Sequence, residues 1–345
     1  MKNHRRSMLY SAVLFLAFSV AACGGGGGSG ASSNSGDSAS TPKDLPAAQS
    51  VVDQSNYVKI AAHAYLAPQS LTDLTELNDT LALGVSVETK APGLAELATD
   101  VLRQLAANQA SMVTAVAQLT SCPSGGTVKM SSSGASLDTL KPGDVVTVET
   151  SNCGVSGLKI NGGLTLTLKE GSAASSQAGA LHSVMQFQFS GLSLASGSET
   201  ALIDGDLTVK SDQTSAGEMT LVLSGASLRT TLTKNGALVT DRTLSGFEST
   251  TNATIAKRTV SMNYTLSASS SSVKDLHVGV KTVTPFVYQG VNNPVSGSML
   301  VTAAASSVAI TAVDAGNVRL DLSAKGDGVI TETRTLSWAE LQNSL

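Results

Sequence analysis

The side chains that can serve as general bases or metal ligands are few and scattered in this chain of 345 residues. We predict His63 on the polar face of its helix and His182 at a polar position of a strand. Nothing in the sequence gathers these two and His277 into a catalytic base or a ligand set. No GxSxG nucleophile elbow, HExxH zinc motif or phosphate-binding P-loop occurs in the chain. Ser and Thr are abundant, but an activated nucleophile also needs a positioned base. The sequence therefore predicts neither an enzyme nor a bound cofactor.

One segment near the C-terminus carries part of a calcium-loop pattern. Asp321, Ser323, Gly326 and Glu332 fall at positions 1, 3, 6 and 12 of the EF-hand loop. Lys325, however, would place a cation at position 5 among the ligands. The flanking residues also alternate as strands do, whereas an EF-hand is flanked by helices. We interpret the segment as a Gly-rich hairpin turn, with no metal site.

The first residues have the pattern of an export signal. Lys2, Arg5 and Arg6 precede an apolar run over 8–20, which is too short to span a bilayer. Small residues follow where a signal peptidase would cut. The sequence therefore predicts that residues 1–22 are a signal peptide.

The residues at that cleavage point resemble the lipobox of bacterial lipoproteins, since Val20, Ala21 and Ala22 are followed by Cys23. The resemblance implies cleavage by signal peptidase II, a diacylglycerol on the Cys23 thiol and a further acyl chain, such as palmitate, on its amino group. Several acyl chains make a durable anchor, because each buried methylene contributes about 0.8 kcal/mol. The alternative is an ordinary signal peptide with a chance cysteine.

Gly24 bears on the destination of such a lipoprotein. In proteobacterial lipoproteins, Asp at this position is the usual signal for retention in the inner membrane. The absence of Asp resembles the outer-membrane pattern. For a Gram-negative host, we therefore predict a lipid-anchored protein of the outer membrane that faces the periplasm or the cell surface.

A polar linker follows the predicted anchor. Residues 24–45 are rich in Gly and Ser and contain no apolar residue larger than Ala until their end. Such a segment cannot bury enough apolar surface to order itself. As a flexible coil it would span about 25 Å. We predict that residues 23–47 are an acylated cysteine and a flexible tether.

Acylation of Cys23 would leave Cys122 and Cys153 as the remaining thiols. An even pair in an exported protein predicts a disulfide. A redox or metal role would need a CxxC motif or a nearby His, and the sequence has neither. The bridge would pin the junction between the predicted helices and the predicted sheet.

Composition limits the remaining function classes. A net charge of −4 argues against a nucleic-acid partner, because such a protein needs a basic surface to replace phosphate counterions. Hydrophobic residues make up 41% of the chain and charged residues 14%, which favours a folded domain over general disorder.

The region 48–121 has the periodicity of helices. A first helix is predicted over 51–65, before Pro68, and a second over 70–81. The strongest helical pattern covers 93–120 and has a nearly unbroken apolar stripe. We expect this stripe to cover a sheet rather than a membrane, because the opposite helix face is not rich in Lys or Arg.

From residue 122 to 345 the periodicity changes to that of strands. Polar residues alternate with apolar ones such as Met185, Phe187 and Phe189; Met219, Leu221 and Leu223; Met262, Tyr264 and Leu266; and Val318, Leu320 and Leu322. Turn-forming residues occur at Asn161-Gly162, Asp204-Gly205, Lys234-Asn235-Gly236 and Gly326-Asp327-Gly328. The similar segments 160–164, 203–207 and 295–299 also predict recurring bulged strands.

These patterns predict an α+β, mainly β, fold in which N-terminal helices (48–121) pack on a large curved antiparallel β-meander (122–345) as one domain. The alternative architecture is a β-solenoid, which the irregular spacing of the similar segments disfavours.

The predicted function is that of a membrane-anchored envelope lipoprotein with a structural or interaction role. The alternative is a carrier or binding protein for a lipid or other hydrophobic ligand. A tethered curved sheet capped by a helix resembles, in architecture only, the half-barrel carriers of lipids or lipoproteins in cell envelopes. An apolar cavity between the 93–120 helix and the sheet would distinguish the two.

Overall fold

The computed structural model describes residues 50–68, 118–133, 140–155, 157–171, 181–214, 218–254, 256–271, 273–289 and 293–345. All of them belong to one compact unit, Asp44–Leu345. The predicted signal peptide, the acylated Cys23, the tether, the helix over 70–81 and residues 93–117 of the long predicted helix lie outside the described residues.

The described chain forms one short N-terminal helix, fourteen strands and one C-terminal helix. In chain order they are α1 (Tyr57–Leu66), β1 (Gln118–Ser121), β2 (Thr127–Ser132), β3 (Val145–Val155), β4 (Leu158–Gly171), β5 (Leu181–Ser196), β6 (Glu199–Gln213), β7 (Met219–Lys234), β8 (Ala237–Ala253), β9 (Arg258–Ser270), β10 (Leu276–Tyr288), β11 (Ser296–Thr302), β12 (Ser307–Ala312), β13 (Asn317–Ser323), β14 (Glu332–Ser337) and α5 (Trp338–Gln342).

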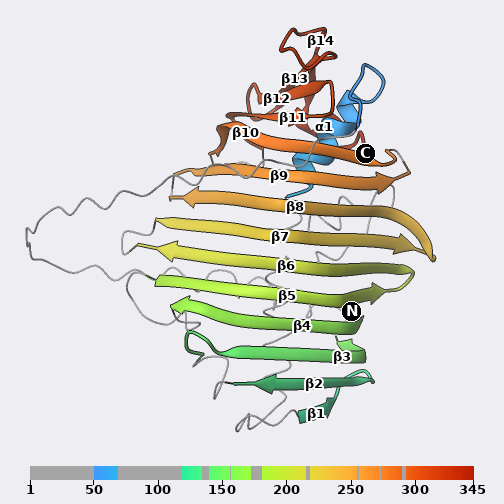
Figure 1. Cartoon of the computed structure of the whole chain (residues 1–345), viewed down its shortest axis with the longest axis vertical. Helices are drawn as coiled ribbons and strands as arrows, with labels where there is room; N and C mark the ends of the chain where they lie inside the picture. Colours follow the sequence, from blue (N-terminus) through green and yellow to red (C-terminus); the bar gives the residue numbers. More distant parts are fainter. Residues whose placement is uncertain are drawn as a thin grey trace, which may run out of the picture. The chain divides into compact units, whose positions relative to one another are not determined.

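The strands form a single antiparallel sheet of 14 strands whose spatial order is the order of the sequence (Figure 1). Each strand pairs with the one before it and the one after it, and β1 and β14 are the two edges. Period-2 alternation in the sequence produces this arrangement, because a half-buried strand has one apolar face. The prediction of a mainly β fold is confirmed.

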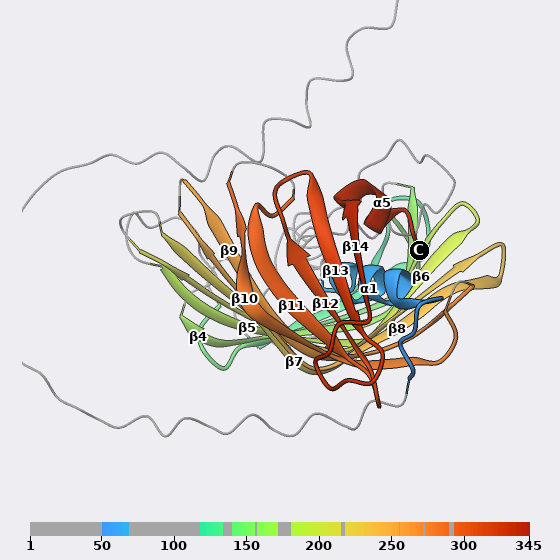
Figure 2. The same cartoon turned by 90° about the horizontal axis from the view of Figure 1, so that it is seen from above.

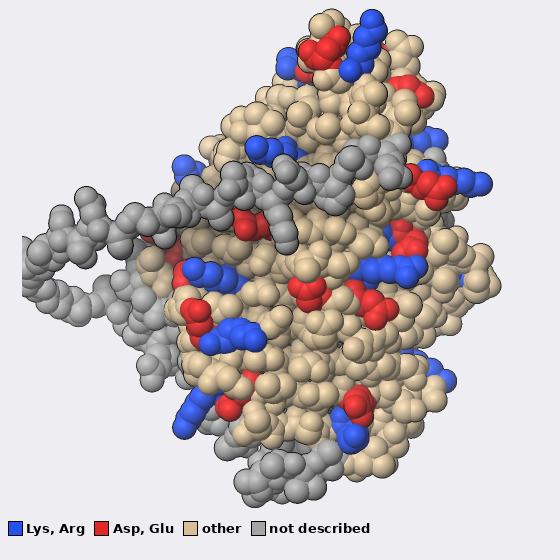
Figure 3. All heavy atoms as spheres, in the orientation of Figure 1, with Lys and Arg blue, Asp and Glu red and all other residues tan. Residues whose placement is uncertain are grey.

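One face of the sheet is apolar, and we call it the inner face. Its buried side chains alternate along every long strand and include Phe187, Leu207, Phe247, Tyr264, Val280 and Val301. The opposite or outer face carries Thr, Ser, Gln and charged side chains, such as Gln186 and Gln188 of β5. Acidic and basic side chains lie scattered in Figure 3 with the two signs interspersed. The inner face is therefore the core side of the sheet.

The three similar segments mark bulges in the sheet. Gly162, Gly205 and Gly297 have φ of 98°, 116° and 125°, where L side chains are rarely found. The register of the adjacent strand pair shifts at each of them. A Cβ on Gly162 would lie 2.1 Å from the carbonyl oxygen of Gly191, so only glycine fits there. The predicted recurring bulges are confirmed, and they increase the twist and bend of a sheet.

Two of the predicted turns are wrong. Asn161-Gly162 and Asp204-Gly205 lie inside β4 and β6 rather than between strands. Positive φ serves a bulge as well as a turn, so the dipeptide pattern does not distinguish them. Lys234-Asn235-Gly236 does join β7 to β8, as predicted.

Helix α1 lies on the inner face, which curves around it in Figure 2. The ring of Tyr65 packs at 4.8 Å from that of Trp338 in α5 and at 5.8 Å from that of Phe286 in β10. The hydroxyl of Tyr264 in β9 donates to the carbonyl oxygen of Ala64. A helix that is buried on nearly every side, as α1 is, belongs to a core rather than a surface.

Two details of the helix predictions are wrong. The first helix starts at Tyr57, so Val51 precedes it and is exposed. Residues 118–120, predicted to end the long helix, belong to β1 and pair with β2. The edge pairing with β2 supplies the hydrogen bonds that a last helical turn would otherwise make, so tertiary context overrides the helical pattern.

Candidate functional site

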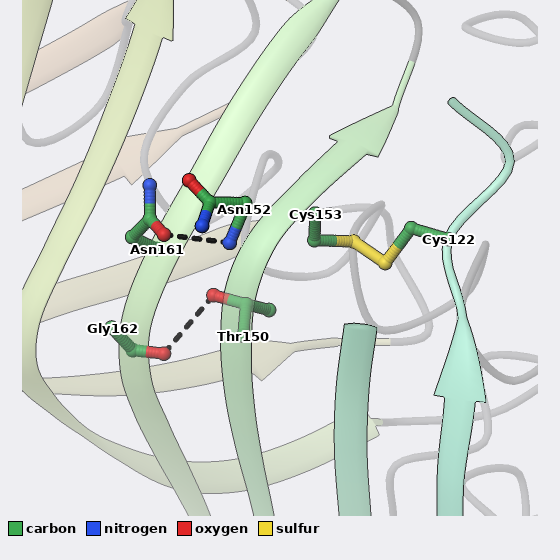
Figure 4. Close-up of a disulfide and its surroundings, with 6 residues drawn as sticks. All are labelled: Cys122, Thr150, Asn152, Cys153, Asn161 and Gly162. Carbon is green, nitrogen blue, oxygen red and sulfur yellow. Dashed lines mark hydrogen bonds between the residues drawn. A yellow bond between two sulfur atoms is a disulfide. The ribbon is translucent and has the colours of Figure 1, made fainter. Parts of the chain in front are cut away.

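Cys122 and Cys153 are joined by a disulfide, with their Cα atoms 5.3 Å apart (Figure 4). This is the pairing expected from the sequence. Cys122 follows β1, and Cys153 lies in β3 beyond a register shift. The backbone N–H of Asn152 donates to Asn161 Oδ1 at 2.6 Å, which fixes the chain beside the bridge. The disulfide therefore links the edge of the sheet to its third strand, and its role is structural.

The segment that continues the predicted tether is tied to the C-terminal part of the sheet. The Ser50 hydroxyl accepts from the backbone N–H of His277 at 2.6 Å. The backbone N–H of Val52 donates to Ser306 Oγ at 2.8 Å, and that of Ala304 donates to the Ser50 carbonyl oxygen at 3.1 Å. The chain thus enters the folded body at one end of β10 to β12.

Exposed apolar side chains lie around this entry point. Val51 is 61% exposed, and Val329 and Ile330 of the β13–β14 loop are 62% and 57% exposed. The loop and the entry segment both approach Ser306, since a Cβ on Gly326 would be 3.3 Å from the backbone nitrogen of Ser306, whose Oγ accepts from Val52. We call Val51, Val329 and Ile330 the entry patch.

A second group of residues forms a polar cluster buried between α1 and the inner face. His63 is 2% exposed and Arg242 of β8 is 6% exposed. One Nη of Arg242 lies 3.4 Å from His63 Nδ1, and His63 Nε2 lies 3.5 Å from Ser270 Oγ. Because a guanidinium can only donate, Nδ1 accepts and the ring proton resides on Nε2. The prediction that His63 lies on a polar, exposed helix face is therefore wrong.

Burial sets the protonation of this cluster. Desolvation, followed by the positive charge of Arg242, lowers the pKa of His63 to about 3, so the imidazole is neutral at physiological pH. Desolvation also lowers the pKa of Arg242 to about 10, and the guanidinium remains charged. Burial raises the pKa of Tyr264, whose phenol stays protonated. The cluster carries one positive charge.

Two polar atoms of the cluster have no partner within the part of the chain that the structure describes. Arg242 Nε is buried and donates no hydrogen bond there, and Thr240 Oγ1 is buried and neither donates nor accepts one. Thr240 and Arg242 occupy alternate inward positions of β8, so both side chains point to the same face. Among the described residues, no carboxylate lies within ion-pair distance of Arg242; its neighbour in sequence, Asp241, instead pairs with Arg229 on the outer face.

His182 lies in the opposite environment, on the outer face. Its Nδ1 contacts Asp212 and its Nε2 lies 3.0 Å from Glu170 Oε2. Hydrogen bonds that the ring donates to Asp212 and then to Glu170 raise the pKa of His182. The group is open to solvent, as the sequence predicted for this position.

The remaining candidates lie apart. His277 Nδ1 is 2.7 Å from Ser267 Oγ, and its ring is far along the chain from the other histidines. The calcium-like segment is flanked by β13 and β14, as predicted for a hairpin. The carboxylate of Asp321 is engaged by Arg319 and Thr333.

The described residues offer neither a metal-ligand cluster nor a membrane-spanning helix. Within the described ranges, no three His, Cys, Asp or Glu side chains are grouped as metal ligands are. Over the same part of the chain, neither helix has the length and apolarity to cross a membrane.

Comparison with known proteins adds no relative. No protein-family model, no curated protein and no solved structure matches this chain. Function must therefore be argued from the residues themselves.

The sequence did not single out the buried cluster. The signal that identifies it is Arg242 at an inward position, between Thr240 and Leu244 in the alternation of β8. A charged residue is almost never fully buried unless it is paired. A cation in an otherwise apolar period-2 pattern is thus the feature that marks this site.

Proposed function

We propose that this protein is a lipid-anchored lipoprotein of the bacterial outer membrane with a structural or interaction role. The observation that carries the proposal is the lipobox-like run ending at Cys23, followed at once by a Gly/Ser-rich tether. Acyl chains at Cys23 would hold the protein in the membrane, and the tether would let the folded body move about the anchor.

The position of the entry patch supports this arrangement. The tether meets the folded body at Ser50, beside the exposed side chains of Val51, Val329 and Ile330. In this proposal, the anchor would be connected to the body at this end. Apolar side chains are tolerated at a membrane surface, because the interface accepts them.

We further propose that the predicted helix over 93–117 covers the inner face of the long strands, as its apolar stripe indicates. A filled inner face favours a structural or interaction role over a carrier, because a carrier needs room for its ligand. Leu105 lies on the stripe and Arg103 lies away from it. Leu105→Ala should lower stability by about 2–5 kcal/mol, and Arg103→Ala by less than about 0.5 kcal/mol.

The anchor is tested by metabolic labelling with palmitate and by partition into detergent on phase separation. The unaltered protein should be labelled and should enter the detergent phase, whereas Cys23→Ala should be unlabelled. Ser35→Ala, within the tether, is the matched control and should behave as the unaltered protein. Equal labelling and partition of the unaltered and Cys23→Ala proteins would refute the proposal.

The role of the body is tested by mass spectrometry of lipids that copurify with the Cys23→Ala protein. A filled inner face predicts no stoichiometric lipid. A copurified lipid at one per chain, together with unchanged stability of Leu105→Ala, would instead identify a carrier.

A further inference from the structure

Among the described residues, no acidic side chain balances the charge of Arg242. Arg242 is 6% exposed, and its Nε has no hydrogen-bond partner within the described ranges. The partner of its Nη, His63 Nδ1, is a neutral acceptor at 3.4 Å. Burial of an unpaired charge is among the most unfavourable events in folding, so a buried Arg is normally paired with an anion.

A second unsatisfied group lies next to it. Thr240 Oγ1 is buried without a partner, two residues before Arg242 on the same inward face of β8. Buried hydroxyl groups are nearly always hydrogen-bonded. The two side chains stand next to each other on one face of β8, so we infer that a single acceptor between them would satisfy both.

We propose that the inner face of β8 holds a binding site for a monovalent anion, with Arg242 Nε and Thr240 Oγ1 as its donors. One negative charge balances the single positive charge of Arg242, whereas a divalent phosphate would leave one charge buried. The guanidinium suits carboxylates as well as halides, because it is a planar, weakly hydrated donor. This site is independent of the lipid anchor.

The surroundings limit the size of the anion. Thr230 of β7 and Ala268 of β9 lie opposite Arg242, and Leu232 and Ser270 lie opposite Thr240. His63 of α1 contacts the Nη of Arg242. Because Arg242 and Thr240 are both buried, we expect a small anion, a halide or a short carboxylate such as formate.

Thermal unfolding of the purified protein in a sulfate buffer of constant ionic strength tests the site. Chloride, bromide, formate and decanoate are added separately. At about 100-fold excess over Kd, the bound anion should raise Tm by about 5–10 °C, and the rise should saturate. If decanoate raised Tm more than formate did, the site would hold a long-chain carboxylate, and the inferred limit on the size of the anion would be wrong.

Two arginine variants provide the comparison. Arg242→Met removes the buried charge while keeping a long side chain, and it should abolish the response to every anion. Arg229→Met removes an exposed cation of the outer face and should leave the response intact. An equal response in Arg242→Met, or no saturable response of the unaltered protein to any of the four anions, would overturn the proposal.

Anomalous scattering from crystals grown in bromide gives an answer that does not depend on a variant. The site predicts a bromide peak within hydrogen-bond distance of Arg242 Nε and Thr240 Oγ1. A map with no peak there, or with an acidic side chain of the chain itself on Arg242, would exclude the site.

Discussion

The two sides of the sheet place ionisable residues in opposite environments. Against the inner face, His63 of α1 meets a buried cation and its pKa falls to about 3. On the outer face, His182 of β5 meets two solvated carboxylates and its pKa rises. The difference shows that the side of the sheet decides the charge of a histidine, because the inner side removes water and the outer side keeps it.

The two arginines repeat this contrast on adjacent strands. Arg229 forms two hydrogen bonds to the carboxylate of Asp241, at 2.9 and 2.7 Å, on the outer face. Arg242 follows Asp241 directly but points inward, away from that carboxylate. Sequence neighbours in a strand are therefore not partners, and the buried arginine must find its counter-charge elsewhere.

Truncation of an inner aromatic side chain should produce the largest difference between the faces. Phe187 is buried and its ring stacks on that of Phe189 at 6.4 Å. Phe187→Ala should lower the free energy of unfolding by about 3–5 kcal/mol, because apolar contact is lost and a cavity remains. Gln186→Ala, one residue earlier on the outer face, should change it by less than about 0.5 kcal/mol. Urea unfolding measures both, and equal losses would show that the faces are wrongly assigned.

Loss of the disulfide should have the next largest effect. The bridge closes a separation of 31 residues, and the chain-entropy model gives about 3–4 kcal/mol for such a loop. The double variant Cys122→Ala/Cys153→Ala should therefore unfold at lower urea concentration than the oxidised protein. Peptide mapping without reductant should link the two cysteine peptides. Two free, alkylatable thiols in protein from an oxidising compartment would contradict the pairing.

The two histidines should give pH dependences of opposite sign. The pKa of His63 is about 3 in the folded protein, against an ordinary value of 6.5, so its contribution to stability is complete above pH 6.5 and is lost as pH falls toward 3. The loss should be at most about 1.4 kcal/mol per pH unit. The pKa of His182 is raised, so its contribution is complete below 6.5 and is lost as pH rises through the raised pKa.

Melting temperatures measured from about pH 4 to 8 test both signs. Subtracting the profile of His63→Leu from that of the unaltered protein should leave a difference that shrinks toward acid pH. The same subtraction for His182→Gln should leave one that shrinks toward alkaline pH. If the profiles of both variants ran parallel to that of the unaltered protein, neither histidine would contribute to the pH dependence of stability, and the prediction would be wrong.

The outer arginine pair should have the smallest effect. Arg229 is about half exposed, and exposed ion pairs contribute about 0–1 kcal/mol. Arg229→Gln should therefore lower the free energy of unfolding by less than about 1 kcal/mol, and added salt should reduce the difference. A loss as large as that of Phe187→Ala would show that the outer face is also packed.

The sequence predicts the strands of this fold well and its special sites poorly. Alternation predicted β5, β9 and β13 in the right phase, because half-buried strands expose one face to water. The bulges at Gly162 and Gly205 were visible as repeated motifs, although the same residues were also assigned to turns.

The failures have a common physical origin. His63 and residues 118–120 were assigned from local periodicity, but their environment is set by strands distant in sequence. Helix α1 is buried on both sides and therefore has no exposed polar face. An amphipathic interpretation of its sequence assigns His63 to the wrong environment for this reason. The proposed anion site depends on how β8 pairs with β7 and β9, and no local sequence pattern contains that register.

The position of α1 also has a consequence for biogenesis. Strands that are neighbours in the sheet are consecutive in the sequence, so each pair can form as soon as its second strand has been synthesised. Helix α1 precedes the whole sheet, yet Tyr65 packs on Trp338 of α5, which follows the sheet. A chain that stops short of α5 would leave this apolar helix surface uncovered, and such surfaces attract proteases and chaperones. A truncation ending before Trp338 should therefore be degraded faster than the protein that contains α5.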